Sequence, residues 1–206
     1  MEKKRVLYIC SITAKDPQLR VIDEIGAIEP ILLSGEKREE FDFTPKLSVR
    51  INDLIKTIRG GQTTPIPHVL HFSVHGNKEL GLKFVGRELG ANYQREEYFA
   101  TMFDALLLPN QRIKCVLLNA CHSYSIASKI ISFADYSIGV EGTIHDQAAI
   151  EFSRGFYTQL FDGCSIEECF KFGITYIKSW ILEQCIQIED EGVSYDKRFH
   201  LFTKLT

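Results

Sequence analysis

The chain has 206 residues, of which 45% are hydrophobic and 25% are charged, and its formal net charge at pH 7 is −3. These proportions are ordinary for a soluble globular protein that is long enough to build one sizeable core. The lack of a basic cluster argues against nucleic acid as a direct partner. No apolar stretch approaches the roughly 18 residues that a membrane span needs, so we expect no membrane partner either.

The cysteines and the first residues suggest a compartment. The start, Met1-Glu-Lys-Lys-Arg5, leads directly into a strand-like run that is too short for the core of a signal peptide. Six cysteines are scattered along the chain, at positions 10, 115, 121, 164, 169 and 185. Without an export signal, they are expected to be reduced thiols of a cytoplasmic protein. No CxxC pair is present, so a structural zinc site is not expected.

The N-terminal part predicts a strand followed by a helix. Residues 5–10 form an apolar run typical of a strand. Asp16 followed by Pro17 predicts a helix start, because Asp caps a helix and Pro fits its first turn. Pro30 is expected to kink or shorten this helix. The helix carries apolar residues at helical spacing: Val21, Ile25, Ile28 and Leu32.

The next segment predicts an edge strand and a short helix. Residues 40–49 alternate in polarity, and Pro45 among them fits only at a sheet edge. Gly60 and Gly61 are expected to end the short helix. That helix is marked by Ile51, Leu54, Ile55 and Ile58.

Two apolar runs in the middle of the chain predict central strands of a parallel sheet. They are residues 69–76, which include His75, and residues 115–123, which include Cys121. Between them, residues 79–86 predict a hairpin or edge ribbon and residues 93–108 predict a helix. In open α/β sheets, ligands and catalytic groups gather at the carboxyl ends of the strands.

The last third continues the alternation of helix and strand. Residues 124–133 predict a helix and residues 135–140 a strand. Asp146 is expected to N-cap the next helix, and Ser165 opens the last one with a capping box that includes Glu168. The tail, residues 198–202, predicts an edge strand. The pattern favours a single domain over residues 1–206, with a three-layer α/β fold and a mainly parallel central sheet flanked by helices.

Cys121 and His75 form a candidate catalytic pair. Both are expected at the carboxyl ends of neighbouring strands, with His75 lying 46 residues before Cys121. An imidazole beside a thiol accepts its proton as general base and later returns a proton to a leaving amine. In caspases the histidine precedes the cysteine by roughly 50 residues. Gly76 allows a close backbone approach, so its N–H and that of Cys121 are candidates for an oxyanion hole.

Other interpretations of these residues remain open from the residues alone. A cysteine at a strand end is commonly a small buried hydrophobic residue, and a His-Gly pair is commonly a turn. A metal site would use His71, His75, Cys121 and His122, although these spacings fit no common site. His71 is expected to pack against the sheet.

The motifs resemble those of the CHAT peptidases, which are bacterial caspase-like proteins. The resemblance is carried by His71-Phe-Ser-Val-His-Gly76 and Cys115-Val-Leu-Leu-Asn-Ala-Cys-His-Ser123. It continues through Leu19-Arg20, Glu24-Ile25, Tyr136-Ser-Ile-Gly-Val140, Asp146-Gln-Ala-Ala-Ile-Glu-Phe152, Gly155-Phe-Tyr157 and Ser165-Ile-Glu-Glu-Cys-Phe170. It departs from the family at Val74, where the family usually has glycine.

The resemblance implies a caspase–haemoglobinase-like fold and hydrolysis of a peptide bond in a protein, without a metal or other cofactor. It implies His75 as base and Cys121 as nucleophile. Asn119 matches the position that borders the pocket for P1, the substrate residue before the cut. Asp146 matches an acid that contacts a basic P1 side chain in separases, which would favour cleavage after Arg or Lys. Asp146 can also act only as a helix cap.

Three functions are compatible with the sequence. The first is a cysteine endopeptidase that cleaves a protein partner, in a bacterial antiviral defence or regulated-proteolysis pathway and controlled by a regulatory or sensor protein in trans. The second is a catalytically weak caspase-like module that acts as an interaction scaffold. The third, a nucleotide-binding α/β protein, is least favoured because no glycine-rich phosphate loop follows the first strand.

Overall fold

A six-stranded sheet runs through the centre of the computed structural model, which describes residues 3–12, 20–61, 64–86, 90–184, 189–190 and 193–204. Its strand order is β11-β8-β7-β3-β1-β2. All neighbouring strands are parallel except β11, which pairs antiparallel with β8 at one edge. The strands are β1 (Lys4–Ser11), β2 (Phe41–Lys46), β3 (Val69–Val74), β7 (Ile113–Asn119), β8 (Ala134–Val140) and β11 (Phe199–Thr203).

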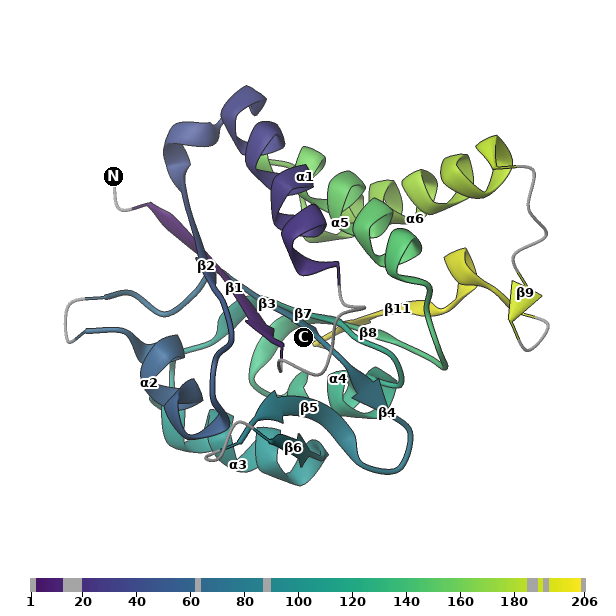
Figure 1. The fold of residues 1–206 in the computed structure, drawn as a ribbon. Coiled ribbons are helices and arrows are strands. Elements are labelled where there is room, and N and C mark those ends of the chain that lie inside the picture. The colour runs from purple at the N-terminus through teal and green to yellow at the C-terminus, as the bar shows by residue number, and fades with distance from the viewer. Residues whose placement is uncertain are drawn as a thin grey trace.

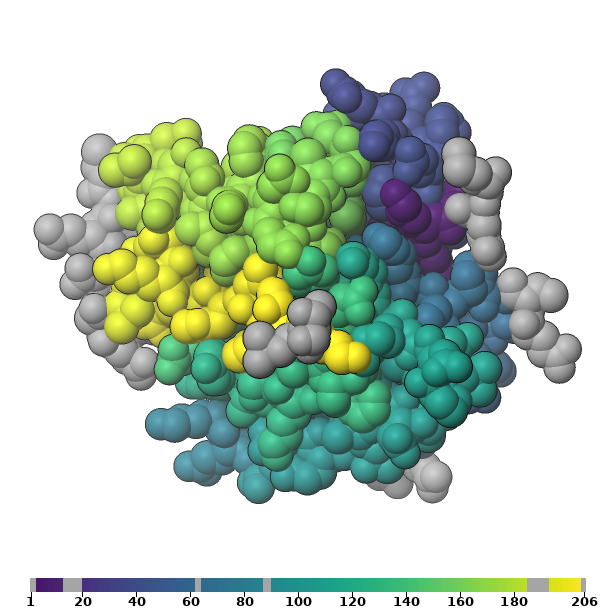
Figure 2. Space-filling model, turned by 180° about the vertical axis from the view of Figure 1, so that it is seen from behind, coloured from purple at the N-terminus to yellow at the C-terminus, as the bar shows by residue number. Residues whose placement is uncertain are grey.

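Helices cover both faces of this sheet (Figure 1). On one face lie α1 (Val21–Ser34), α5 (Asp146–Phe161) and α6 (Ile166–Glu183), and on the other lie α2 (Leu54–Arg59), α3 (Glu96–Leu106) and α4 (Tyr124–Ile130). Seen from behind, the yellow C-terminal residues form a band between the green residues of α5 and α6 and the teal residues of the other layer (Figure 2). The predicted three-layer α/β fold is therefore confirmed.

Alternation along each strand divides the core between the two faces. In β1, Val6 and Tyr8 pack with α1 and α5, whereas Leu7 and Ile9 pack with α2 and α3. Successive side chains of a strand point to opposite faces, and both faces of a helix-covered sheet are apolar. The continuous apolar runs of the central strands follow directly from this arrangement.

Smaller sheets lie beside the central one. The antiparallel strands β4 (Gly76–Asn77), β5 (Gly81–Val85) and β6 (Ala91–Gln94) form a three-stranded sheet that begins directly after His75. This small sheet agrees with the hairpin or edge ribbon predicted for residues 79–86. The pair β9 (Glu189–Asp190) and β10 (Val193–Ser194) precedes β11. No helix in the described part of the chain is long and apolar enough to cross a membrane.

Most predicted elements are confirmed, with differences at their ends. The helix predicted from residue 93 begins at Glu96, because Tyr93 pairs with Lys83 in the small sheet. The helix predicted to reach residue 133 ends at Ile130. Pro30 lies inside α1 and does not shorten it, since the helix continues to Ser34. The predicted cap at Asp16 and Pro17 lies outside the described residues.

Several local sequence signals have the structural roles predicted for them. Gly60 adopts φ 66° at the end of α2, a conformation that glycine reaches without steric cost. Pro45 lies in β2 at the sheet edge, where no further strand needs its missing N–H. Ser165 and Glu168 form the predicted capping box of α6.

Candidate active site

Strand register brings His75 and Cys121 to the same edge of the sheet. Ser73 of β3 pairs with Asn119 of β7 in a parallel ladder. His75 follows Ser73 by two positions, and Cys121 follows Asn119 by two positions. The two predicted catalytic residues therefore lie at matching places just beyond the ends of neighbouring strands. The prediction that these residues follow the ends of neighbouring strands is thus confirmed.

Gly76 fits tightly against the backbone of Cys121. A Cβ atom added to Gly76 would lie 1.7 Å from the carbonyl oxygen of Cys121. Gly76 pairs with Leu82 in the small sheet, and the adjacent bond runs from the N–H of Lys83 to the carbonyl of His75. In an antiparallel ladder, residue pairs that exchange hydrogen bonds alternate with pairs that do not. His75 and Lys83 form a hydrogen-bonded pair, so Gly76 and Leu82 form a pair of the other kind. The N–H of Gly76 is therefore not used by its β5 partner.

Cys121 lies in a tight turn that other backbone groups stabilise. His122 adopts φ 54°, and its N–H donates to the carbonyl of Gly142 (2.8 Å). The buried hydroxyl of Ser123 donates to the carbonyl of Ala120 (2.7 Å) and accepts from the N–H of Val140 (2.9 Å). These bonds connect the turn after β7 to the end of β8.

The thiol of Cys121 contacts the backbone of Ile144. The N–H of Ile144 donates to Sγ at 3.3 Å, and Sγ lies 3.8 Å from the carbonyl oxygen of Ile144. Burial is the main cause that raises the pKa of Cys121, and the negative charge of Asp146 raises it further. The Ile144 hydrogen bond and the Arg198 guanidinium act in the opposite direction. The thiol in this conformation is therefore protonated at neutral pH.

One small pocket collects the predicted residues. It is lined by His75, Asn119, Cys121 and Asp146, together with residues that the motifs did not indicate as lining a pocket: Arg20, Val21, Glu24, Ser73, Val74, Ala120, Ile144, Ala149 and Ile150. Its volume, about 40 Å³, has room for water but not for a long side chain. A substrate side chain can enter only after the lining residues move apart.

The prediction that Asp146 caps its helix is wrong. His145 is the N-cap of α5, and its Nδ1 accepts from the N–H of Gln147 (3.1 Å), while Asp146 is the first helical residue. Burial raises the pKa of Asp146, and the nearby His75 opposes this increase. Asp146 nevertheless lines the pocket.

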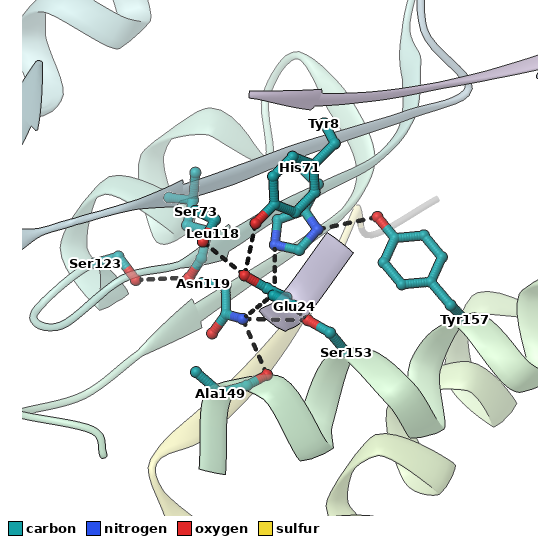
Figure 3. Close-up of polar contacts among 10 residues, drawn as sticks. All are labelled: Tyr8, Glu24, His71, Ser73, Leu118, Asn119, Ser123, Ala149, Ser153 and Tyr157. Atoms are coloured by element: carbon teal, nitrogen blue, oxygen red, sulfur yellow. Dashed lines mark hydrogen bonds and ion pairs between the residues drawn. The ribbon is translucent and has the colours of Figure 1, made fainter. Parts of the chain in front are cut away.

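Glu24 of α1, a buried carboxylate with 3% of its surface exposed, is among the residues that line the pocket. Figure 3 shows the side chains that surround it. Tyr8 donates to Oε2 at 2.7 Å and Ser73 to the same oxygen at 2.6 Å. Asn119 donates to Oε1 at 2.8 Å and Ser153 at 2.5 Å. Burial and Glu24 both raise the pKa of Tyr8, so its hydroxyl remains a donor. Four donors around one group are the arrangement that an ionised carboxylate requires.

The sequence contained one signal for Glu24. The residue lies between Val21, Ile25 and Ile28 on the stripe of α1 that faces the core. A charged residue on a buried helical stripe is rare unless it has partners. The stripe therefore marks Glu24 as a polar residue inside the core, but its partners come from four other elements.

His71 and His122 do not join His75 and Cys121. His71 is fully buried, and its Nδ1 lies 3.0 Å from the hydroxyl of Tyr157. Burial lowers the pKa of His71 to about 4, so it is neutral. His122 lines a separate hollow with Asn77 and Glu96. The arrangement considered for a metal is therefore not formed, and His71 packs against the sheet as predicted.

Comparisons with known proteins show that the chain is similar to proteases. No known family profile matches the chain. It is 26% identical over 169 residues to a Roc-COR-CHAT protease of an unidentified prokaryote, covering 80% of this chain and 16% of that protein. It is 27% identical to a probable protease of Gillisia limnaea, with coverages of 86% and 31%. It is 28% identical to a Roc-COR-CHAT protease of Runella zeae, with coverages of 98% and 21%. The chain thus spans less than a third of each relative's length.

A solved structure shares the fold. It is a secreted C11 cysteine protease from Bacteroides thetaiotaomicron in complex with an irreversible peptide inhibitor, with a TM-score of 0.69 and 12% sequence identity. The match covers 98% of this chain and 66% of that one. The resemblance to the CHAT peptidases and the caspase-like fold, both expected from the motifs, are confirmed by these relatives and this structure.

The buried neutral His71 predicts a loss of stability in acid. Its pKa is about 4 in the folded protein and near the ordinary 6.5 in the unfolded chain. Unfolding then takes up a proton between these values, so stability falls as pH decreases from about 6.5 to about 4, by about 3 kcal/mol in total. Urea unfolding of the His71→Gln protein should show a weaker acid dependence than wild type. Equal dependence in both proteins would contradict the assignment.

Substitution of Gly76 is expected to disturb the nucleophile. In Gly76→Ala, the new Cβ would overlap the Cys121 carbonyl, so the turn must shift. We expect a lower melting temperature and at least a tenfold change in the alkylation rate of Cys121. Gly26→Ala is the matched control, because nothing lies within 4 Å of its added Cβ. The control should be stabilised by about 0.5–1 kcal/mol. A Gly76→Ala protein with wild-type stability and alkylation would refute the close approach.

Proposed function

We propose that this chain is a cysteine endopeptidase that cleaves a protein partner by means of a Cys121–His75 dyad. The observation that carries the proposal is a small pocket at the carboxyl edge of the sheet that brings together His75, Asn119, Cys121 and Asp146. The protease relatives and the caspase-like fold support the same chemistry.

The proposed reaction begins with proton transfer from Cys121 Sγ to the imidazole of His75. The thiolate attacks the scissile carbonyl carbon, and the N–H groups of Gly76 and Cys121 stabilise the oxyanion. The tetrahedral intermediate collapses to a thioester as the leaving amine takes the proton from His75. Water, deprotonated by His75, then hydrolyses the thioester, which releases the acid and restores the thiol.

The conformation described above fits a resting state of such an enzyme. The Cys121 pKa is raised, its thiol contacts Ile144, and the pocket is small. A substrate that reaches the sulfur displaces Ile144 from it. Proton transfer then requires direct contact between the thiol and the His75 imidazole, because loss of the Ile144 hydrogen bond alone raises the Cys121 pKa further. The second candidate, a catalytically weak interaction scaffold, is favoured only by this closed state. Labelling of the thiol separates the two functions.

Charges in the pocket support a preference for a basic P1 residue. The pocket has two carboxylates, those of Glu24 and Asp146. The one arginine among its lining residues, Arg20, donates to Asp23 (2.5 Å) and Gln147 (2.7 Å), so its charge is partly used outside the pocket. A cationic P1 side chain would face a net negative surface.

The relatives suggest the context of the reaction. Two of them are named Roc-COR-CHAT proteases, and each is several times longer than this chain. We place this chain in a bacterial defence or regulated-proteolysis pathway, where a regulatory or sensor protein acting in trans opens the pocket. This placement depends on the resemblance to the CHAT peptidases.

An activity-based probe tests the dyad. A peptide library is screened first for cleavage, and a thiol-reactive peptide probe is then applied to wild type, Cys121→Ala and His75→Ala. Wild type should be labelled at Cys121, Cys121→Ala should not be labelled there, and His75→Ala should react at least 100-fold more slowly, as expected for loss of a general base. Cys164→Ala is the control, since Cys164 lies outside the pocket. Unchanged labelling in both dyad variants would exclude the mechanism.

Asp146 is tested by the choice of P1 residue. Asp146→Asn keeps the shape of the side chain but removes its charge, so the preference for Arg over norleucine at P1 should fall at least tenfold in kcat/KM. Glu29→Gln, which removes an exposed carboxylate of α1 that does not line the pocket, should keep the wild-type preference. If the Asp146 variant cleaves basic sites as well as wild type does, Asp146 has no role in specificity.

A further inference from the structure

The amide of Asn119 has only one orientation that satisfies its neighbours. Its Nδ2 lies 2.8 Å from Glu24 Oε1 and 3.1 Å from the carbonyl oxygen of Ala149. Both neighbours are acceptors, so neither can receive a hydrogen bond from Oδ1. Ser153 lies 3.2 Å from the same nitrogen and gives its own proton to Glu24. The nitrogen must therefore face α1 and α5.

The oxygen of the same amide is left without a partner. Asn119 is 4% exposed, and among the described residues no group donates to its Oδ1. Figure 3 shows this oxygen turned away from Glu24, Ser153 and Ala149, which surround the nitrogen. Asn119 lines the pocket beside Cys121, but its Oδ1 is itself buried, so a ligand reaches this acceptor only when the lining residues move apart. A buried acceptor without a donor is costly, so a ligand that supplies a donor is favoured.

Glu24 is the group that maintains this arrangement. Its carboxylate is fixed from four directions by side chains of β1, β3, β7 and α5, namely Tyr8, Ser73, Asn119 and Ser153. A carboxylate can only accept, so it prevents rotation of the Asn119 amide. The side chain of Glu24 also lies at the pocket lining, where its charge favours cationic donors over neutral ones.

We propose that Glu24 is a positioning residue, whose buried carboxylate fixes the Asn119 amide so that Oδ1 accepts a hydrogen bond from the P1 side chain. The inference rests on the proposed peptidase function and deepens it, because it names the P1 class as a side chain with an N–H donor. Asp146 recognises the charge of that side chain, whereas the Glu24–Asn119 pair recognises its N–H groups.

Three peptides that differ only at P1 separate these two effects. Norleucine has no donor, citrulline has N–H donors without a charge, and arginine has both. We define the donor preference as the ratio of kcat/KM for citrulline to that for norleucine. One neutral hydrogen bond predicts a donor preference of about tenfold in wild type. The change should lie in KM more than in kcat, because the contact is already made in the bound substrate.

Variants of Glu24 test its positioning role. Glu24→Met has a similar length but no acceptor, so the donor preference should fall to about one, whereas Glu24→Gln offers an acceptor oxygen again and should restore part of it. Glu167→Met is the matched control, because it removes a carboxylate that accepts from Tyr136 outside the pocket. This control should keep the wild-type donor preference. A merely structural role of Glu24 would reduce cleavage of all three peptides equally, and that result overturns the inference.

A wild-type complex provides a measurement that does not depend on the folding of a variant. A peptide aldehyde with citrulline at P1, bound to Cys121, should place a ureido N–H within hydrogen-bond distance of Asn119 Oδ1. A bound citrulline that contacts no atom of Asn119 overturns the inference.

Failure of the peptidase function has a different signature. Wild type would then cleave none of the peptides, and the aldehyde would not attach to Cys121. Calorimetry of Cys121→Ala with the uncleaved peptides still tests the subsite, since citrulline should bind about tenfold more tightly than norleucine. Equal affinities would overturn the inference independently of catalysis.

Discussion

The buried carboxylate of Glu24 is the interaction on which the geometry of this edge of the sheet depends. An isolated carboxylate in an apolar core would be strongly unfavourable, and this one is compensated by donors from four elements. Hydrogen bonds to charged groups contribute about 1.5–3 kcal/mol each. Since those donors lie on β1, β3, β7 and α5, they fix the relative positions of three strand ends and two helices. The pocket is built directly on these strand ends.

Backbone packing then places the candidate nucleophile. The close approach of Gly76 to the Cys121 carbonyl leaves no space for any other residue at position 76 unless the turn moves. The positive φ of His122 and the bonds of Ser123 hold the opposite side of the same turn. Cys121 is thus positioned by main-chain contacts on both sides, and its thiol contacts the backbone of Ile144. A preorganised backbone of this kind is what an oxyanion site requires.

Much of this arrangement could be predicted from the sequence, and the part that could not has a physical reason. The strands that end near His75 and Cys121 were recognisable because buried parallel strands have continuous apolar runs. The capping box at Ser165 has a fixed local spacing. The Asp146 cap was mispredicted because the adjacent His145, a less common capping residue, supplies the acceptor.

Contacts between distant segments explain the other differences. The sequence pattern predicts a helix from residue 93, but Tyr93 pairs with Lys83 of β5, and this contact with another strand overrides the local helical preference. The four hydrogen-bond donors to Glu24 lie between 16 residues before it and 129 after it in the chain, and His71 Nε2 lies 3.5 Å from its Oε1. No local pattern could identify these partners. The contact between Ile144 and the thiol depends on the path of a loop with no regular spacing.

The loop that contacts the thiol also connects the site to the C-terminal strand. Arg198 donates to the carbonyl of Thr143 (2.9 Å), and its own carbonyl accepts from the N–H of Glu141 (2.8 Å). His145 stacks on Trp180 of α6, with ring centroids 5.7 Å apart. The backbone around Ile144 is therefore fixed by α6 and by the residues before β11. Because Ile144 contacts the sulfur, the surroundings of the Cys121 thiol depend on contacts that α6 and the residues before β11 make far from Cys121 in sequence.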